Sequence, residues 1–202
     1  MKNKLYAVWS LNCLIMMLLY CGNSWADTNT DANTLVPRPP GLFTLTPGGG
    51  YFWFSGKQKL DNTAVGVISL GYNATKHWTT ELSGGLFETK RKDISSNDNS
   101  YFYSIGNLYY FRVEKRLQPY LIGGFGVTHI KNPANNDPRS LANISGGGGL
   151  ELQMDRRTAL RAEVKDVYTF TGSKQDVLVT LGMSFFIGGH SSNSKKSQNR
   201  ST

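Results

Sequence analysis

The chain has 202 residues, a formal charge of +8 and two cysteines, and 39% of its residues are hydrophobic. This length suits one domain. Both cysteines, Cys13 and Cys21, precede the point where we expect the chain to be cut, which excludes disulfides, thiolate metal sites and thiol nucleophiles from the processed protein. Its basic residues are scattered along the chain, so we expect no nucleic-acid partner.

The first residues have the features of a secretory signal peptide. Lys2 and Lys4 form a basic start, and the apolar run Leu11–Tyr20 is too short to span a membrane as a helix. Ser24 and Ala26 place small residues before the expected cleavage site, after Ala26. The sequence therefore predicts a signal peptide at 1–26, a polar leader at 27–41, a β-domain at 42–188 and a polar tail at 189–202.

Eight segments after the leader alternate apolar and polar residues, which is typical of β-strands with one apolar face. In the last segment, Val177, Val179 and Leu181 share a face, while Thr180 and Gly182 fall on the other. The expected strands are Phe43–Ser55, Thr63–Tyr72, Trp78–Phe87, Tyr101–Val113, Tyr120–Ile130, Asn143–Gln153, Thr158–Tyr168 and Asp176–Ile187.

The connections between these strands alternate between short and long. Transmembrane β-barrels have this rhythm, with short periplasmic turns and longer outer loops. A strand of about eleven residues, tilted by about 40°, rises roughly 28 Å, which matches the hydrocarbon layer of a bilayer. We therefore predict an all-β fold, an eight-stranded antiparallel up-and-down transmembrane β-barrel.

The polar faces of the strands carry charges of both signs. In a barrel of this size these side chains are enclosed and must pair, because an unpaired buried charge is very costly. Asp166 and Lys174 lie nearby in the sequence, and Asn107 interrupts an apolar face, which would fit a bulge or a turn toward the lumen. The expected structural lumen charges are Glu81, Glu151, Arg161, Glu163 and Lys165.

Aromatic residues gather at the ends of the expected strands. Two belts of amphipathic rings are what the two interfaces of a membrane select. Tyr72, Trp78, Phe111, Tyr120 and Phe185 would form the belt near the short turns, and Trp53, Tyr101, Tyr103 and Tyr168 the belt near the long loops.

Several stretches resemble the outer-membrane β-barrel domain shared by OmpA-type and small porin-like proteins of Gram-negative bacteria. They are YNATKHWTTELSGGLFE, PYLIGGFGVTHI, ALRAEVKD and LVTLGMSFFI, within Leu42–Gly188. The resemblance implies export to the bacterial outer membrane, contact with its lipid and lipopolysaccharide, and insertion by the barrel-assembly machinery. Thr180, Gly182, Phe185 and Ile187 fit the terminal pattern that this machinery reads. The polar tail departs from that pattern, and without a peptidoglycan-binding domain no cell-wall tether is expected.

The sequence offers little for catalysis. His77 falls in a short turn, His190 in the tail, and His129 near the outer rim with Thr128 and Asp137 nearby in the sequence. Without a positioned partner for general-base chemistry or any metal-ligand spacing, we expect no catalytic residue, cofactor or metal.

The sequence thus predicts a monomeric, non-enzymatic outer-membrane barrel. Its role would be structural, in envelope integrity, or in surface contact through the loops at 88–100 and 131–142, with a narrow pore also compatible. One alternative is an enzyme that modifies lipid A or phospholipid through His129. Another is a soluble periplasmic lipocalin-like binding protein.

Overall fold

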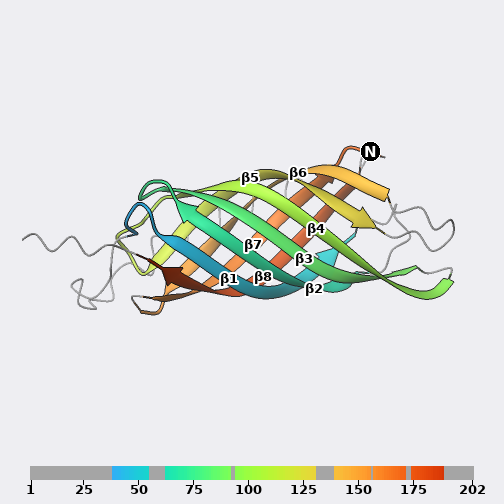
Figure 1. Ribbon diagram of the computed structural model, residues 1–202, viewed down its shortest axis with the longest axis horizontal. Coiled ribbons are helices and arrows are strands. Elements are labelled where there is room, and N and C mark those ends of the chain that lie inside the picture. The colour runs from blue at the N-terminus through green and yellow to red at the C-terminus, as the bar shows by residue number, and fades with distance from the viewer. Residues whose placement is uncertain are drawn as a thin grey trace, which may run out of the picture.

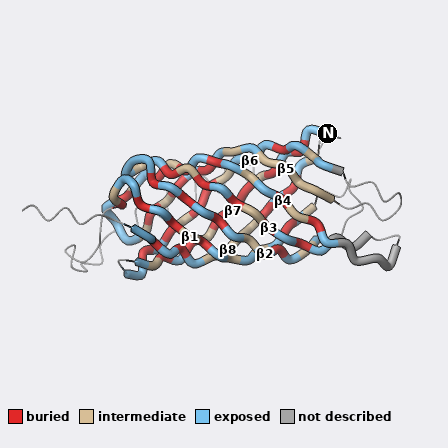
Figure 2. Tube along the Cα trace, viewed as in Figure 1, coloured by how far each residue is buried: buried red, intermediate tan, exposed pale blue. Residues whose placement is uncertain are grey.

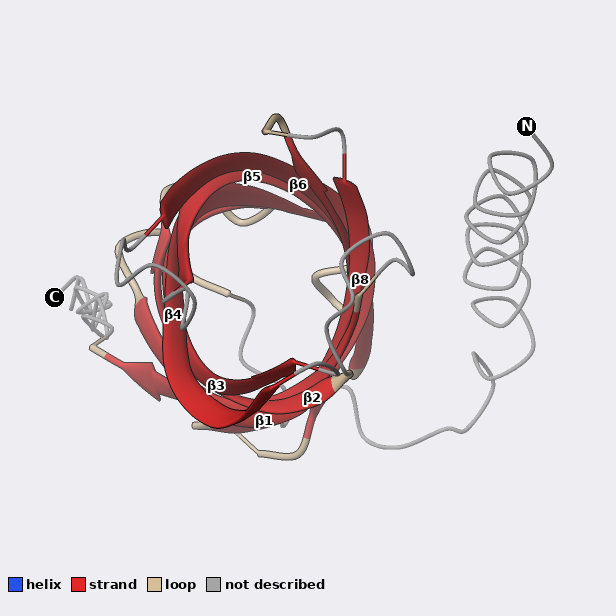
Figure 3. Cartoon of the chain, turned by 90° about the vertical axis from the view of Figure 1, so that its right-hand side faces the viewer, coloured by secondary structure: helices blue, strands red, loops and turns tan. Residues whose placement is uncertain are grey.

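The computed structural model describes residues 38–54, 62–91, 94–130, 139–155, 157–171 and 174–188. Each strand pairs with the next in antiparallel register, and β8 pairs with β1, which closes the barrel (Figures 1 and 3). The expected all-β, eight-stranded fold is confirmed, and no helix in these ranges is long and apolar enough to cross a bilayer. The strands are β1 (Phe43–Trp53), β2 (Thr63–Asn73), β3 (Trp78–Arg91), β4 (Ile94–Tyr110), β5 (Leu117–Ile130), β6 (Arg139–Gln153), β7 (Thr158–Thr169) and β8 (Lys174–Ile187).

Side chains alternate between an apolar outer wall and a largely polar interior. In β7, Leu160 is 44% exposed, whereas its neighbour Arg161 is 6% exposed. The same alternation of exposed and buried residues follows the strands around the barrel (Figure 2). A strand turns successive side chains to opposite faces, so the two-residue period of the sequence fixes which side chains face inward.

The two ends of the barrel differ. The short-turn end carries the connections 74–77, 111–116 and 154–157, and the long-loop end carries 54–62, 92–93, 131–138 and 170–173. The expected loop at 88–100 is mostly strand, because β3 and β4 stay paired past Lys90 and Asn97 and, after a register shift between Lys90 and Arg91, pair again at Arg91 and Ile94. This hairpin projects beyond the other strands (Figure 1). The two strands stay hydrogen-bonded beyond the barrel wall, because strand pairing satisfies backbone N–H and C=O groups whatever the side chains are.

Two side chains differ from expectation. Asn107 forms no bulge or inward slip: the register of β4 is continuous there, and Asn107 lies exposed on the outer wall, where it accepts a 2.9 Å hydrogen bond from Thr80. Tyr120 does not belong to the aromatic belt, because it faces the lumen and is 1% exposed. Tyr120 shares the inward face of β5 with Gln118 and Ile122, so strand alternation overrides its rim position.

The interior is layered along the barrel. An apolar cluster fills the long-loop end, formed by Phe52, Val65, Phe87, Phe102, Val167 and Leu178. A second cluster lies against β4 and β5 toward the short-turn end and contains Leu108, Tyr110, Val113, Tyr120 and Ile122. The charged side chains lie at the level of this second cluster, whose Tyr110 and Tyr120 hydroxyls donate hydrogen bonds to Glu151 and Glu163.

Candidate functional site: the charged lumen

Arg161 of β7 is the centre of the lumen network. It forms ion pairs with Glu81 of β3, across the barrel, and with Glu163 on its own strand. Its Nε also donates a 2.8 Å hydrogen bond to the hydroxyl of Tyr120. A planar guanidinium with five donors suits this role, because it can serve several acceptors at once.

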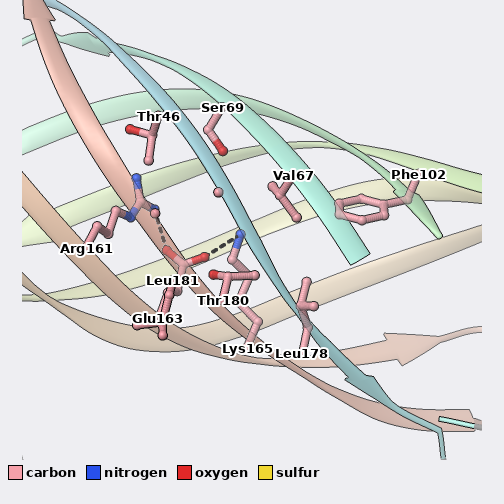
Figure 4. A pocket seen from close by; sticks show the side chains of 12 residues that line it. Thr46, Val67, Ser69, Phe102, Arg161, Glu163, Lys165, Leu178, Thr180 and Leu181 are labelled. Carbon is pink, nitrogen blue, oxygen red and sulfur yellow. Dashed lines mark hydrogen bonds and ion pairs between the residues drawn. The ribbon is translucent and has the colours of Figure 1, made fainter. Parts of the chain in front are cut away.

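The network extends from Arg161 along β7 and, through Glu81, onto the opposite wall. Lys165 Nζ lies 2.8 Å from Glu163 Oε1, and the Tyr120 hydroxyl donates a 2.7 Å hydrogen bond to Glu163 (Figure 4 shows the Arg161–Glu163–Lys165 chain). On the opposite wall, Ser83 donates a 2.9 Å hydrogen bond to Glu81. The buried charges are therefore paired and also hydrogen-bonded, as enclosed ions require.

The fifth expected lumen charge, Glu151, pairs with a residue that sequence reasoning did not place in the lumen. Arg38, at the end of the expected leader, is 2% exposed and forms an ion pair with Glu151. Its Nε donates a 3.1 Å hydrogen bond to Gln118, and its guanidinium lies 3.7 Å from the centre of the Tyr110 ring. Charge balance is a signal that could have identified it: the five expected charges comprise three acids and two bases, and Arg38 brings their sum to zero.

Asp166 lies apart from this network. Asp166 occupies an outward-facing position of β7, and its carboxylate accepts a hydrogen bond from the side chain of Gln175 on β8. Although adjacent in sequence to Lys165, it faces the other side of the wall, since neighbouring residues of a strand point in opposite directions.

A small cavity lies beside the ionic chain. It has a volume of about 20 Å³ and is bordered by Arg161, Glu163 and Lys165, with Phe102 and Leu178 on its apolar side (Figure 4). Such a volume holds about one water molecule. The cavity can hydrate the charged groups but cannot hold an organic ligand.

The residues expected to form the assembly signal divide between the two faces of β8. Thr180 and Gly182 share its inward face, whereas Phe185 and Ile187 are 38% and 53% exposed on the outer wall at the short-turn end. A Cβ at Gly182 would lie 2.9 Å from the Pro47 carbonyl oxygen. Glycine thus permits close approach of the strands at the β1–β8 seam.

His129 lies on the outer wall of β5 near the long-loop end. Its ring stacks on Tyr101 with a 4.8 Å centroid separation, and its Nδ1 lies 2.9 Å from Ser140 Oγ. Asp137 and His190 lie outside the described residues. In the part of the chain that the structure describes, no group of three or more His, Cys, Asp or Glu side chains could hold a metal ion.

The comparisons with known proteins agree with this geometry. The N-terminal barrel of Pseudomonas aeruginosa OprF superposes with a TM-score of 0.57 at 17% identity, covering 73% of this chain and 98% of that one. Neisserial surface protein A gives 0.61 at 13% identity, covering 72% and 98%. Ail, the attachment invasion locus protein of Yersinia pestis, gives 0.54 at 16% identity, covering 73% and 99%.

At these identities the superpositions establish the fold alone. Among curated protein sequences, none matches this chain significantly. The family described as "Outer membrane protein beta-barrel domain" matches residues 39–185, which is most of the chain. The matched range includes all five expected lumen charges and begins one residue after Arg38. The chain therefore belongs to the outer membrane protein β-barrel domain family.

Proposed function

We propose that this protein is a monomeric, non-enzymatic barrel of the bacterial outer membrane with a structural or surface-contact role. The observation that carries the proposal is its reversed polarity: large apolar side chains such as Leu86 and Phe125, both 68% exposed, lie outside, whereas ion pairs lie inside. A soluble lipocalin-like carrier would need polar side chains on its outer wall. An apolar outer wall is instead stable in hydrocarbon.

Two sets of exposed aromatic rings support a membrane location. At the short-turn end, Phe43 contacts Tyr72 with a 5.1 Å centroid separation, and Trp78 contacts Tyr109 at the same separation. At the long-loop end, Trp53, Tyr103 and Tyr168 are between 40% and 48% exposed. Amphipathic rings favour the two interfaces of a bilayer, so the hydrocarbon would surround the wall between these sets.

The filled lumen favours a structural role over diffusive transport. The ionic network occupies the middle of the barrel, and the Phe52–Phe102 cluster fills the long-loop end. An eight-stranded barrel has an interior that side chains can fill, whereas open aqueous channels need about sixteen strands. Any conduction would require these side chains to move, so we expect no steady conductance in a planar bilayer.

The β3–β4 hairpin is the element that we propose for surface contact. It extends beyond the barrel wall, and its outer part, at 89–98, is rich in polar residues. Loops and hairpin tips on a rigid scaffold commonly carry recognition. Replacing 90–97 by a two-residue turn should leave the barrel folded but abolish adhesion of producing cells to a host surface or to one another. Unchanged adhesion would contradict a surface-contact role and would leave envelope integrity as the remaining role.

Catalysis through His129 has weaker support. Ser140 supplies a hydroxyl near the ring, but no carboxylate among the described side chains bonds to His129, so a Ser-His-acid arrangement is incomplete there. We expect the lipid A and phospholipid masses of a deletion strain to equal those of the parent. A lost or altered lipid species would favour the enzymatic alternative.

The location is tested by expressing the full chain in a Gram-negative host and fractionating the cells. We expect the protein in the outer-membrane fraction, with faster gel migration before heating than after it. Such a location would also fit contact with lipopolysaccharide and insertion by the barrel-assembly machinery through β8. Recovery in the soluble periplasmic fraction without detergent would overturn the proposal.

A further inference from the structure

Positive charge is concentrated at one end of the barrel. The three short turns contain six basic residues and two acidic residues, a net charge of +4 with neutral histidine, whereas the four long-loop connections have a net charge of +1. Among the basic residues of the short turns, Lys76, Lys115, Arg116 and Arg157 are exposed. We call these four residues the basic rim.

The basic rim lies directly beside the exposed aromatic rings of the short-turn end. Lys76 is two residues from Trp78, which is 50% exposed and contacts Tyr109. Across the barrel, the carbonyl of Arg157 accepts a 2.9 Å hydrogen bond from the backbone N–H of Phe186, the neighbour of Phe185 on the outer wall. Flexible Lys and Arg side chains at this level can reach the adjoining headgroups.

We propose that the basic rim binds the anionic headgroups of phospholipids around the short-turn end. The aromatic rings hold this end of the barrel at the membrane interface, so the cations next to them lie close to the lipid phosphates. Attraction between a basic side chain and an anionic membrane surface is strong at such short range. The four cations are exposed and come from all three turns, so they can engage several lipids around the circumference.

This inference rests on the proposed membrane location, and its test separates the two. The chain has four tryptophans, and a W9F/W25F/W53F protein keeps Trp78 alone as a reporter of lipid at the short-turn end. A companion W9F/W25F/W78F protein reports from Trp53 at the long-loop end. Each is refolded into vesicles of brominated phosphatidylglycerol, brominated phosphatidylcholine or their mixtures, and quenching of its fluorescence gives the relative binding constant of the two lipids.

We expect Trp78 to report a preference of about threefold for the anionic lipid, within the roughly fivefold that one basic residue can contribute near an anionic surface. K76Q/K115Q/R116Q should reduce this preference to about one, with the Trp53 reporter unchanged. E114Q, a change to an exposed acid in the same turn, should preserve or raise it. Added salt should lower it by screening.

The possible failures are distinguishable. If neither tryptophan is quenched by either lipid, the membrane location is wrong. If both lipids quench Trp78 equally while the protein is inserted, or if the preference survives K76Q/K115Q/R116Q, the basic rim does not select anionic headgroups. Should the triple variant fail to refold, K115Q alone and the salt dependence of the parent protein decide the same question.

Discussion

Arg38 and Glu151, 113 residues apart in the sequence, form an ion pair inside the barrel, where each side chain is 2% exposed. The pair connects the segment before β1 to the wall at β6. Since Glu151 also accepts a 3.2 Å hydrogen bond from Tyr110, the carboxylate is held from two sides. The end of the expected leader is thereby part of the folded barrel and neutralises a buried acid.

Loss of the Arg38 side chain should destabilise the barrel strongly. R38Q leaves Glu151 buried without its cation, and breaking a buried pair from one side commonly lowers the free energy of unfolding by about 3–5 kcal/mol. Urea unfolding of the protein in vesicles, followed by tryptophan fluorescence, measures the change. The double variant R38Q/E151Q is the control: it removes both charges and should recover part of the loss. A double variant no more stable than R38Q would count against a charge effect.

Arg161 should be the most sensitive position of the lumen network. R161L removes the shared partner of Glu81 and Glu163, which leaves the buried Glu81 without its ion pair and Glu163 paired with Lys165 alone. We expect a loss of about 3–5 kcal/mol and a lower temperature at which the folded form disappears on a gel. R157L, a matched change in the exposed β6–β7 turn, should remain within about 0.5 kcal/mol of the parent. Equal heat resistance of R161L and the parent would contradict a structural role for the network.

Much of this architecture could be predicted from residue alternation alone. The period of two places Arg161, Glu163 and Lys165 on one face of β7 and Leu160 on the other, which is how they lie. It could not place Arg38, which is outside any strand and reaches the lumen only through tertiary structure. Nearness to a turn wrongly predicts Tyr120 at the rim, because its position in the two-residue period of β5 turns the side chain inward. The β3–β4 extension was missed because polar residues in a hairpin can continue a ladder without an apolar face.

Glycine at position 149 should be required for the position of Tyr120. A Cβ there would overlap the Tyr120 ring and hydroxyl and the Ala162 carbonyl oxygen. G149A must displace Tyr120 from Arg161 and Glu163, and overpacking of this kind costs about 1–3 kcal/mol. G146A is the matched control on the same strand, because its Cβ meets nothing within 4 Å on the outer wall. Urea unfolding should show a loss only for G149A, and similar stabilities would indicate that the ring can relax freely.

The β6–β7 turn should contribute a pH-dependent stabilisation through Asp155. Hydrogen bonds from the Arg157 backbone N–H, at 2.6 Å, and from the Thr158 side chain, at 2.8 Å, lower the pKa of Asp155 from its ordinary value of 3.8. Because the folded pKa lies below the unfolded one, the stabilisation is complete above about pH 4 and is lost as the pH falls through the folded pKa.

The comparison that tests this is between the parent protein and D155N, which keeps an acceptor but cannot ionise. The parent should be more stable at pH 7, and the difference in unfolding free energy should stay constant down to about pH 4 and shrink below that, as Asp155 becomes protonated. Subtracting the two curves removes the titration of the other acids, which both proteins share. Asp155 is exposed, so added salt should weaken the charged part of the effect but leave the direction of the pH dependence unchanged. A difference that grows as the pH falls would show that the ionised carboxylate does not stabilise this turn.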